Sequence, residues 1–167
     1  MILTSDQIRE RIKEEFDSGK YFWEEKLHKT NAIKDKAFFV PDAEEFKKDF
    51  ETVKEIVAQE YKIDIHRVHE LLTHESIYDC DNMARKLRTS LHDLHYKRYR
   101  AKWHSISHEY ACFQVTEIRP AMLINQLIAH DFCMIFTAQG IYFGDLSVSE
   151  RQVWSLKTFR PHIIGIF

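Results

Sequence analysis

Glycine, proline and cysteine are scarce in this chain, which has four glycines, three prolines and three cysteines among 167 residues. So few glycines and prolines argue against a long flexible linker. The phosphate-binding patterns G-x-x-x-x-G-K-[ST] and G-x-G-x-x-G are absent, so no nucleotide-binding loop is predicted. The pattern G-x-S-x-G is also absent, and no serine or cysteine has a base partner at a recognisable spacing. The sequence therefore predicts no catalytic residue.

The three cysteines, Cys80, Cys112 and Cys133, form an odd set without C-x-x-C spacing. This pattern argues against a disulfide framework and a cysteine-rich zinc site, so we expect reduced, buried thiols and no cofactor. The N-terminal segment lacks the basic and apolar regions of a secretory signal. Apolar runs are shorter than the roughly 20 residues needed to span a bilayer. A cytoplasmic location without a membrane partner is expected.

Hydrophobic residues make up 44% of the chain, and twelve residues are phenylalanine, which is typical of a globular protein. At this length, folding removes roughly 70% of the surface of the unfolded chain from water, so a sizeable core can form. The formal net charge is −2. A globally basic nucleic-acid-binding protein is therefore excluded, and any such function must depend on a local patch.

Two helices in the N-terminal half are predicted by capping residues followed by apolar residues at helical spacing. Thr4-x-x-Gln7 precedes the first of them, and its apolar residues are Ile8, Ile12 and Phe16. Asp42-x-x-Glu45 precedes the second, whose apolar stripe comprises Phe46, Phe50, Val53, Val57 and Tyr61. Further helices are expected over residues 21–29 and 64–74 and in the basic stretch 81–104. We expect four to five helices in a helical region spanning residues 1–104.

After residue 104 the pattern changes to short apolar runs typical of strands. Strands are predicted over residues 108–118, 132–137, 141–146 and 162–167, and helices over 120–128 and 147–156. The order of elements is βαββαβ, as in the ferredoxin-like fold, and a winged arrangement is the alternative. The predicted fold class is therefore α+β, with residues 105–167 forming a small antiparallel unit. We expect this unit to pack with the helical region as one compact domain.

The stretch from Asp81 to His104 contains seven basic residues interleaved with tyrosine, tryptophan and histidine. As one helix, it would place leucines on one face and basic and aromatic residues on the other. Arginine pairs with phosphates, and aromatic rings stack on exposed bases. The predicted nucleic-acid-binding residues are Arg85, Arg88, His92, Tyr96, Lys97, Tyr99, Arg100 and Trp103. The first functional hypothesis is therefore a non-enzymatic nucleic-acid-binding or transcription-modulating protein.

Two other geometries of this stretch remain open. A break at Arg88-Thr89-Ser90 gives a spacing of Ala84, Leu87, Ser90 and Leu94 that resembles a helix-turn-helix. Alternatively, the helix is central to the fold, with its leucines packed on the N-terminal helices and its aromatic residues on the C-terminal sheet. None of these geometries predicts an oligomeric state.

Two further functional hypotheses are considered. One depends on the positive charge of the same helix, and the other depends on the ten histidines. In one, the basic helix docks on an acidic surface of a protein partner, as in an adaptor or inhibitor. In the other, histidines form the centre of a metal-dependent hydrolase. The candidate ligands are the pairs His66/His69, His92/His95 and His104/His108, with Asp93 and Asp131. Because carboxylates are few around these pairs, surface or core histidines are the favoured interpretation, and no metal site is predicted.

Overall fold

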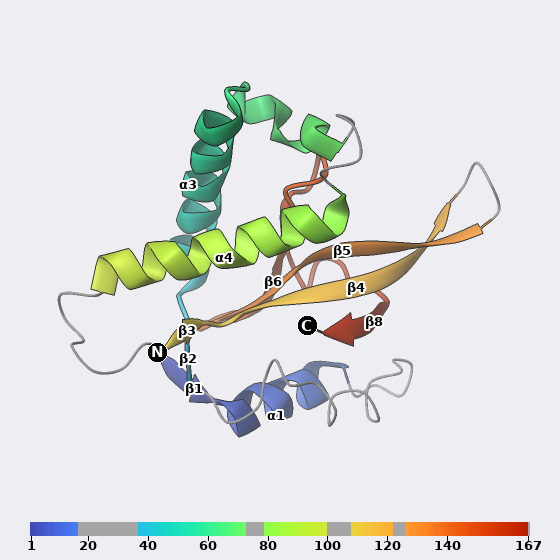
Figure 1. The fold of residues 1–167 in the computed structure, drawn as a ribbon. Helices are drawn as coiled ribbons and strands as arrows, with labels where there is room; N and C mark the ends of the chain where they lie inside the picture. Colours follow the sequence, from blue (N-terminus) through green and yellow to red (C-terminus); the bar gives the residue numbers. More distant parts are fainter. Residues whose placement is uncertain (17–36, 73–78, 100–107, 122–125, 167) are drawn as a thin grey trace.

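A computed structural model describes residues 1–16, 37–72, 79–99, 108–121 and 126–166, and this part of the chain is mixed α and β (Figure 1). It contains four helices, a three-stranded sheet and a five-stranded sheet. The larger sheet is antiparallel and has the order β7-β6-β5-β4-β8. Its strands are β4 (Cys112–Ala121), β5 (Gln126–Thr137), β6 (Gly140–Gly144), β7 (Val153–Ser155) and β8 (Ile163–Ile166). The smaller sheet consists of β1 (Ile2–Thr4), β2 (Ala37–Phe39) and β3 (Glu109–Tyr110).

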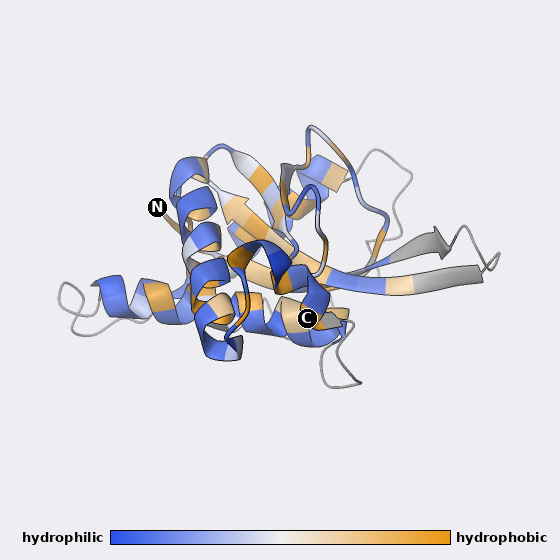
Figure 2. Ribbon diagram, turned by 90° about the horizontal axis from the view of Figure 1, so that it is seen from above, coloured by the Kyte–Doolittle hydropathy of each residue, from blue (hydrophilic) through white to orange (hydrophobic). Residues whose placement is uncertain are grey.

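The five-stranded sheet separates two hydrophobic clusters, because neighbouring residues in a strand face opposite sides. On one side, α1 (Ser5–Phe16) packs against a cluster that includes Phe113, Phe132 and Met134. On the other side, α3 (Ala43–Tyr61) and α4 (Cys80–Tyr99) pack against Cys133 and Ile135. Figure 1 shows the helices on both faces of the sheet. The sheet is largely hydrophobic, whereas the helices also carry hydrophilic residues (Figure 2).

The predicted helix starts are confirmed by their hydrogen bonds. The backbone N–H of Thr4 donates to Gln7 Oε1 at 2.8 Å, and the N–H of Gln7 donates to Thr4 Oγ1 at 3.3 Å. At the start of α3, the N–H of Glu45 donates to Asp42 Oδ1 at 2.7 Å. The 64–74 segment forms a 3₁₀-helix, η2 (Ile65–Leu72), and the predicted helix over 21–29 lies outside the described residues.

The predicted helix over residues 120–128 is wrong, because β4 continues to Ala121 and β5 begins at Gln126. Pro120 suggested the start of a helix, but it pairs with Leu127 in the β4–β5 ladder. Register explains why a proline is tolerated there. Its nitrogen faces away from β5, toward the side where β8 pairs with β4 only over Val115 to Glu117. The apolar residues at 122–128 fit both the helical period and the strand period. The pairing of β5 with β4 from Gln126 onward favours the strand.

The predicted helix over residues 147–156 is also wrong, since Val153–Ser155 forms β7 and pairs with β6. The Ser147-x-x-Glu150 pattern suggested a capping box. Instead, the N–H and hydroxyl of Ser147 both donate to Asp145 Oδ1. Within the described residues 108–121 and 126–166 there is no α-helix. The βαββαβ order and the ferredoxin-like unit are therefore corrected to an antiparallel sheet.

The helical region and the C-terminal sheet contact each other through shared elements. Strand β2 pairs with β3 in parallel, so the smaller sheet joins residues from both sides of position 104. Helix α4 packs on β5, and the thiol of Cys133 donates to the carbonyl of Ala84 at 3.1 Å. Among the described residues, none of the helices is both long and apolar enough to cross a membrane.

Candidate active site

Helix α4 runs without a break from Cys80 to Tyr99, so a helix-turn-helix with a break at residues 88–90 does not form. Ser90 is buried within the helix, and Thr89 Oγ1 donates to the carbonyl of Arg85, the preceding-turn contact of a continuous helix. Met83, Leu87 and Leu91 are buried as the leucine stripe predicts, and Leu94 is partly buried. The buried face of α4 covers the sheet and contacts α3.

Six of the eight predicted nucleic-acid-binding residues lie within the described part of the chain, and these six differ in exposure. Arg85, Tyr96 and Lys97 are exposed, and Asp93 lies between them on the exposed stripe of the helix. A second line along the helix contains the half-buried residues Arg88, His92 and Tyr99. Arg100 and Trp103 lie outside the described residues.

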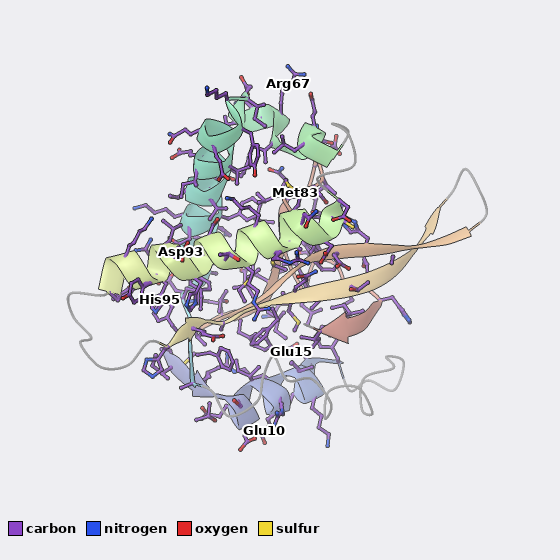
Figure 3. All side chains as sticks on the ribbon, viewed as in Figure 1. Glu10, Glu15, Arg67, Met83, Asp93 and His95 are labelled. Carbon is purple, nitrogen blue, oxygen red and sulfur yellow. The ribbon has the colours of Figure 1, made fainter. Side chains whose placement is uncertain are left out.

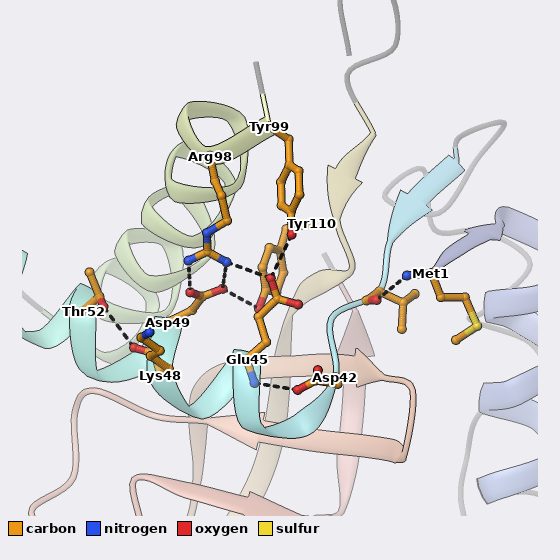
Figure 4. A network of polar contacts seen from close by, with 10 residues as sticks. Met1, Asp42, Glu45, Lys48, Asp49, Thr52, Arg98, Tyr99 and Tyr110 are labelled. Carbon is orange, nitrogen blue, oxygen red and sulfur yellow. Dashed lines mark hydrogen bonds and ion pairs between the residues drawn. The ribbon is translucent and has the colours of Figure 1, made fainter. Parts of the chain in front are cut away.

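Carboxylates already neutralise several cations of the basic stretch. Arg85 pairs with Asp81 at 2.6 Å one turn earlier, and Lys86 pairs with Glu60 of α3. The Arg98 guanidinium contacts Glu45 at 2.8 Å and the buried Asp49, both from α3 (Figure 4). The contact with Asp49 raises the pKa of Arg98 above its ordinary value. Part of the positive charge therefore holds α4 against α3.

The histidine pairs of the described residues do not build a metal centre. His92 Nδ1 accepts a hydrogen bond from the backbone N–H of Tyr110 at 3.4 Å. His95, labelled on α4 in Figure 3, is buried and stacks on Phe39 with ring centroids 4.1 Å apart. Burial lowers the pKa of His95 to about 4. Within the described ranges, no three histidine, cysteine or acidic side chains are placed to hold a metal ion, and His104 lies outside those ranges.

A cysteine, a histidine and an aspartate come together where α4 begins and β6 ends. His130 Nε2 lies 2.6 Å from Asp145 Oδ2, and the His130 side chain also hydrogen-bonds with the Cys80 thiol. Asp145 is 2% exposed, whereas His130 and Cys80 are only partly buried. Since Nε2 is bound to the carboxylate, Nδ1 is the ring nitrogen left for the thiol. A thiol, an imidazole and a carboxylate in this order are the groups that a cysteine-dependent catalytic triad would use as nucleophile, base and orienting acid.

The start of α4 gives Cys80 the environment of a reactive thiol. Cys80 is the first residue of α4. Asp79, the residue before it, accepts a hydrogen bond at Oδ1 from the N–H of Asn82 at 3.0 Å. The hydrogen bond with His130 lowers the pKa of Cys80, and a second hydrogen bond with the backbone of Asp131 acts in the same direction. The positive end of the helix dipole also favours a thiolate. Cys112 and Cys133 are buried instead, and burial raises the pKa of Cys133.

Asp145 is held in place by the turn after β6. Its Oδ1 accepts hydrogen bonds from the N–H and the hydroxyl of Ser147, which leaves Oδ2 directed at His130. The preceding residue, Gly144, sits directly under the helices. A Cβ there would lie 3.1 Å from Leu87 Cδ2 and 3.2 Å from the ring of Phe50, so a larger residue would move α3 and α4 away from β6.

Gln114 on β4 connects the segments that carry Cys80 and His130. Its Nε2 donates to Asp131 Oδ2 at 2.8 Å and also to Asp81 Oδ1. Asp81 follows Cys80, and Asp131 follows His130. The buried amide therefore fixes the start of α4 relative to β5, which is the relation the thiol and the imidazole need.

Sequence reasoning missed this site. It assigned the three cysteines to the core, and the structure corrects this for Cys80, which is partly buried. His130 is 50 positions after Cys80, and Asp145 is 15 positions after His130, so no local spacing connects them. A single half-exposed cysteine at a predicted helix start, with histidine and aspartate elsewhere, is the weak signal that could have suggested it.

Comparison with known proteins identifies one distant likeness of fold. No protein-family model matches the chain, and no curated protein matches it. Among solved structures, the chain is similar to Polyporus squamosus lectin, crystallised with the human-type influenza-binding epitope Neu5Aca2-6Galb1-4GlcNAc, with a TM-score of 0.51 and 10% identity. The match covers 80% of this chain and 40% of the lectin chain. At this identity the likeness concerns the fold alone.

Proposed function

We propose that this protein is a cysteine-dependent acyl-transfer enzyme that cleaves an amide, ester or thioester. The observation that supports this most strongly is the position of His130, which hydrogen-bonds with both the Cys80 thiol and the buried Asp145. A structural ion pair would need only the histidine and the aspartate. The third partner is a partly exposed thiol with a lowered pKa at a helix N-terminus, which is the environment of a nucleophile.

The reaction has two steps, and His130 serves in both. The Cys80 thiol gives its proton to His130, and its sulfur attacks the carbonyl carbon of the substrate. The tetrahedral intermediate collapses, the bond to the leaving group breaks, and the leaving group takes the proton from His130. Water, deprotonated by His130, then attacks the acyl thioester, which releases the acid and restores the thiol. Asp145 holds the imidazole in the tautomer with hydrogen on Nε2 and stabilises its cationic form.

The direct test is to trap the acyl intermediate with p-nitrophenyl acetate. We expect a burst of p-nitrophenolate of about one equivalent per chain, because deacylation of a simple acetyl group is slow, and an acetyl group on Cys80 in peptide mass spectra. Cys112 and Cys133 are internal controls, since both are buried. The Cys80→Ala variant should lose the burst. Acetylation spread over all three cysteines, or a burst that persists in Cys80→Ala, would contradict the proposal.

Binding of nucleic acid by α4 stays a prediction, as does docking of α4 on an acidic protein surface. Tyr96, which is 49% exposed, and the exposed Lys97 give nucleic-acid binding its best described residues. If it occurs, affinity for single-stranded DNA should fall steeply between 50 and 200 mM salt, as counterion release requires. Fluorescence anisotropy should show weaker binding for Lys97→Gln than for Lys13→Gln on α1. Equal affinities of the two variants would exclude a role for this surface.

A further inference from the structure

Among the strands that the structure describes, none lies along one edge of β5 next to the candidate nucleophile. β5 spans Gln126–Thr137 and pairs with β4 from Gln126 to Ile135. On its other side, β6 pairs only with Cys133–Thr137. Among the strands that the structure describes, none pairs with residues 126–132 on that side. The segment includes His130, so the open edge and the triad share a strand.

The register of the hairpin shows which backbone groups face this open edge. Thr137 and Gly140 are paired across a two-residue turn, so Thr137 directs its N–H and C=O toward β6. The N–H of Phe136 donates to Ala111 at 3.0 Å, on the β4 side. Alternation along an antiparallel strand then directs the groups of residues 127, 129 and 131 toward the open edge.

The thiol of Cys80 lies at the inner end of the same edge. The backbone of Asp131 hydrogen-bonds with this thiol, which places the sulfur beside the first outward-facing position after β6 ends. Ala129, the next outward-facing position, is exposed. Two residues of strand span about 6.7 Å. A strand paired at Ala129 would therefore have a carbonyl group within one or two residues of the sulfur.

We propose that the acyl donor of Cys80 is a polypeptide segment that binds in extended conformation along the edge of β5, pairing with Ala129 and Leu127. The inference rests on the proposed function, since it names the substrate of the same thiol. An extended polypeptide is the occupant because it supplies donors and acceptors at the spacing that a strand edge presents. Exposed strand edges are usually blocked by charge, proline or a covering element. No strand in the described part of the chain covers this edge, and the edge leads to the Cys80 thiol. The reaction would be peptide-bond cleavage or acyl transfer from a peptide.

The test uses alanine-based chloromethyl ketones that carry one, two or three residues, together with iodoacetamide as a probe without a peptide. In each case the Cys80 thiolate displaces the halide and forms a thioether. We expect the second-order rate constant in the wild-type protein to rise at least tenfold from the one-residue to the three-residue ketone. N-methylation of the amides that pair with the edge should remove this gain, because the donors are lost.

Variants at Ala129 provide the matched comparison. Ala129→Pro removes the outward N–H without removing a bond to β4, and proline is tolerated on such an edge. It should abolish the dependence on peptide length and leave the iodoacetamide rate unchanged. Ala129→Val keeps the N–H and should behave like the wild type. The N-methylated ketones also remove hydrogen bonds between the peptide and the strand edge, and they do so in the wild-type protein. The test therefore does not depend on how Ala129→Pro folds.

The outcomes separate the two proposals. Equal rates for all three ketones, or for methylated and unmethylated forms, overturn binding at the edge, while rapid His130-dependent alkylation by iodoacetamide would still support the nucleophile. If iodoacetamide reacts with Cys80 at the same rate in the wild-type protein and in His130→Ala, the proposed function is contradicted, whatever the rates of the ketones. A length dependence that is lost on N-methylation and in Ala129→Pro supports an extended peptide as the substrate.

Discussion

Replacing His130 with alanine should slow acetylation of Cys80 by p-nitrophenyl acetate about 10²–10⁴-fold at neutral pH, the usual contribution of a positioned general base. The hydrogen bond with His130 is the largest influence that lowers the pKa of Cys80. Its loss removes stabilisation of the thiolate, so the pKa should rise toward the ordinary value of about 8.5. Stopped-flow measurement of the nitrophenolate burst gives the rate, and iodoacetamide alkylation from pH 5 to 10 gives the pKa.

The direction of the pH effect depends on which protonation state of the Cys80 thiol is favoured by the hydrogen bond with His130. Because the hydrogen bond favours the thiolate, wild-type Cys80 should be alkylated at a pH where an ordinary thiol is still protonated. In His130→Ala the midpoint of the alkylation profile should move to higher pH. A midpoint that stays in place would show that the helix dipole and the hydrogen bond with the backbone of Asp131, and not His130, control the pKa of the thiol.

Two further variants separate catalysis from a general loss of structure. Asp145→Ala should slow acetylation by up to about 10⁴-fold, because the imidazole loses the partner that sets its tautomer. His66→Ala, at an exposed position on η2, should leave both the rate and the profile unchanged. A loss of burst in His66→Ala equal to that in His130→Ala would mean that the effect is not specific to the triad.

The helices could be predicted from the sequence because their signals are local. The capping residues Thr4 and Asp42 lie within three positions of their partners, and the buried residues of α3 and α4 recur at helical spacing. These patterns also gave the correct buried stripe of α4. They could not show where α4 packs, because that depends on strands formed by residues much later in the chain.

The candidate site depends on pairings that no local pattern encodes. The residues around His130 were expected to follow a helix, because the apolar residues at 122–128 also fit a helical period. In the structure, His130 lies inside the long strand β5, paired with Glu117. Cys80 reaches it only because α4 packs on β5 and Gln114 binds both Asp81 and Asp131. The charged stretch is a contiguous pattern in the sequence, whereas Cys80, His130 and Asp145 are isolated residues that only the fold brings together.

Replacing Arg98 with methionine should lower the free energy of unfolding by about 3 kcal/mol, at the low end of the range for breaking a buried ion pair. Asp49 is 1% exposed, and its carboxylate contacts the Arg98 guanidinium and, at 3.3 Å, the hydroxyl of Tyr110 (Figure 4). Removal of the guanidinium leaves the buried carboxylate with the neutral hydroxyl of Tyr110 as its side-chain partner among the described residues. Because the Arg98 side chain is 38% exposed, water can reach part of the vacated space and limits the loss.

A double-mutant cycle of Arg98 and Asp49 shows whether the loss of stability in Arg98→Met comes from the unpaired buried charge or from lost packing. In Asp49→Leu/Arg98→Met the fully buried carboxylate of Asp49 is gone, and the carboxylate of Glu45, which is 24% exposed, remains within reach of water. The double variant should therefore be more stable than Arg98→Met in urea titrations monitored by circular dichroism. Arg85→Met is the matched control, since its pair with Asp81 joins side chains that are 62% and 40% exposed, and it should change stability by less than about 0.5 kcal/mol. If Arg98→Met and Arg85→Met lose equally little, Arg98 does not hold α3 and α4 together, and its charge is available to a partner of the α4 surface.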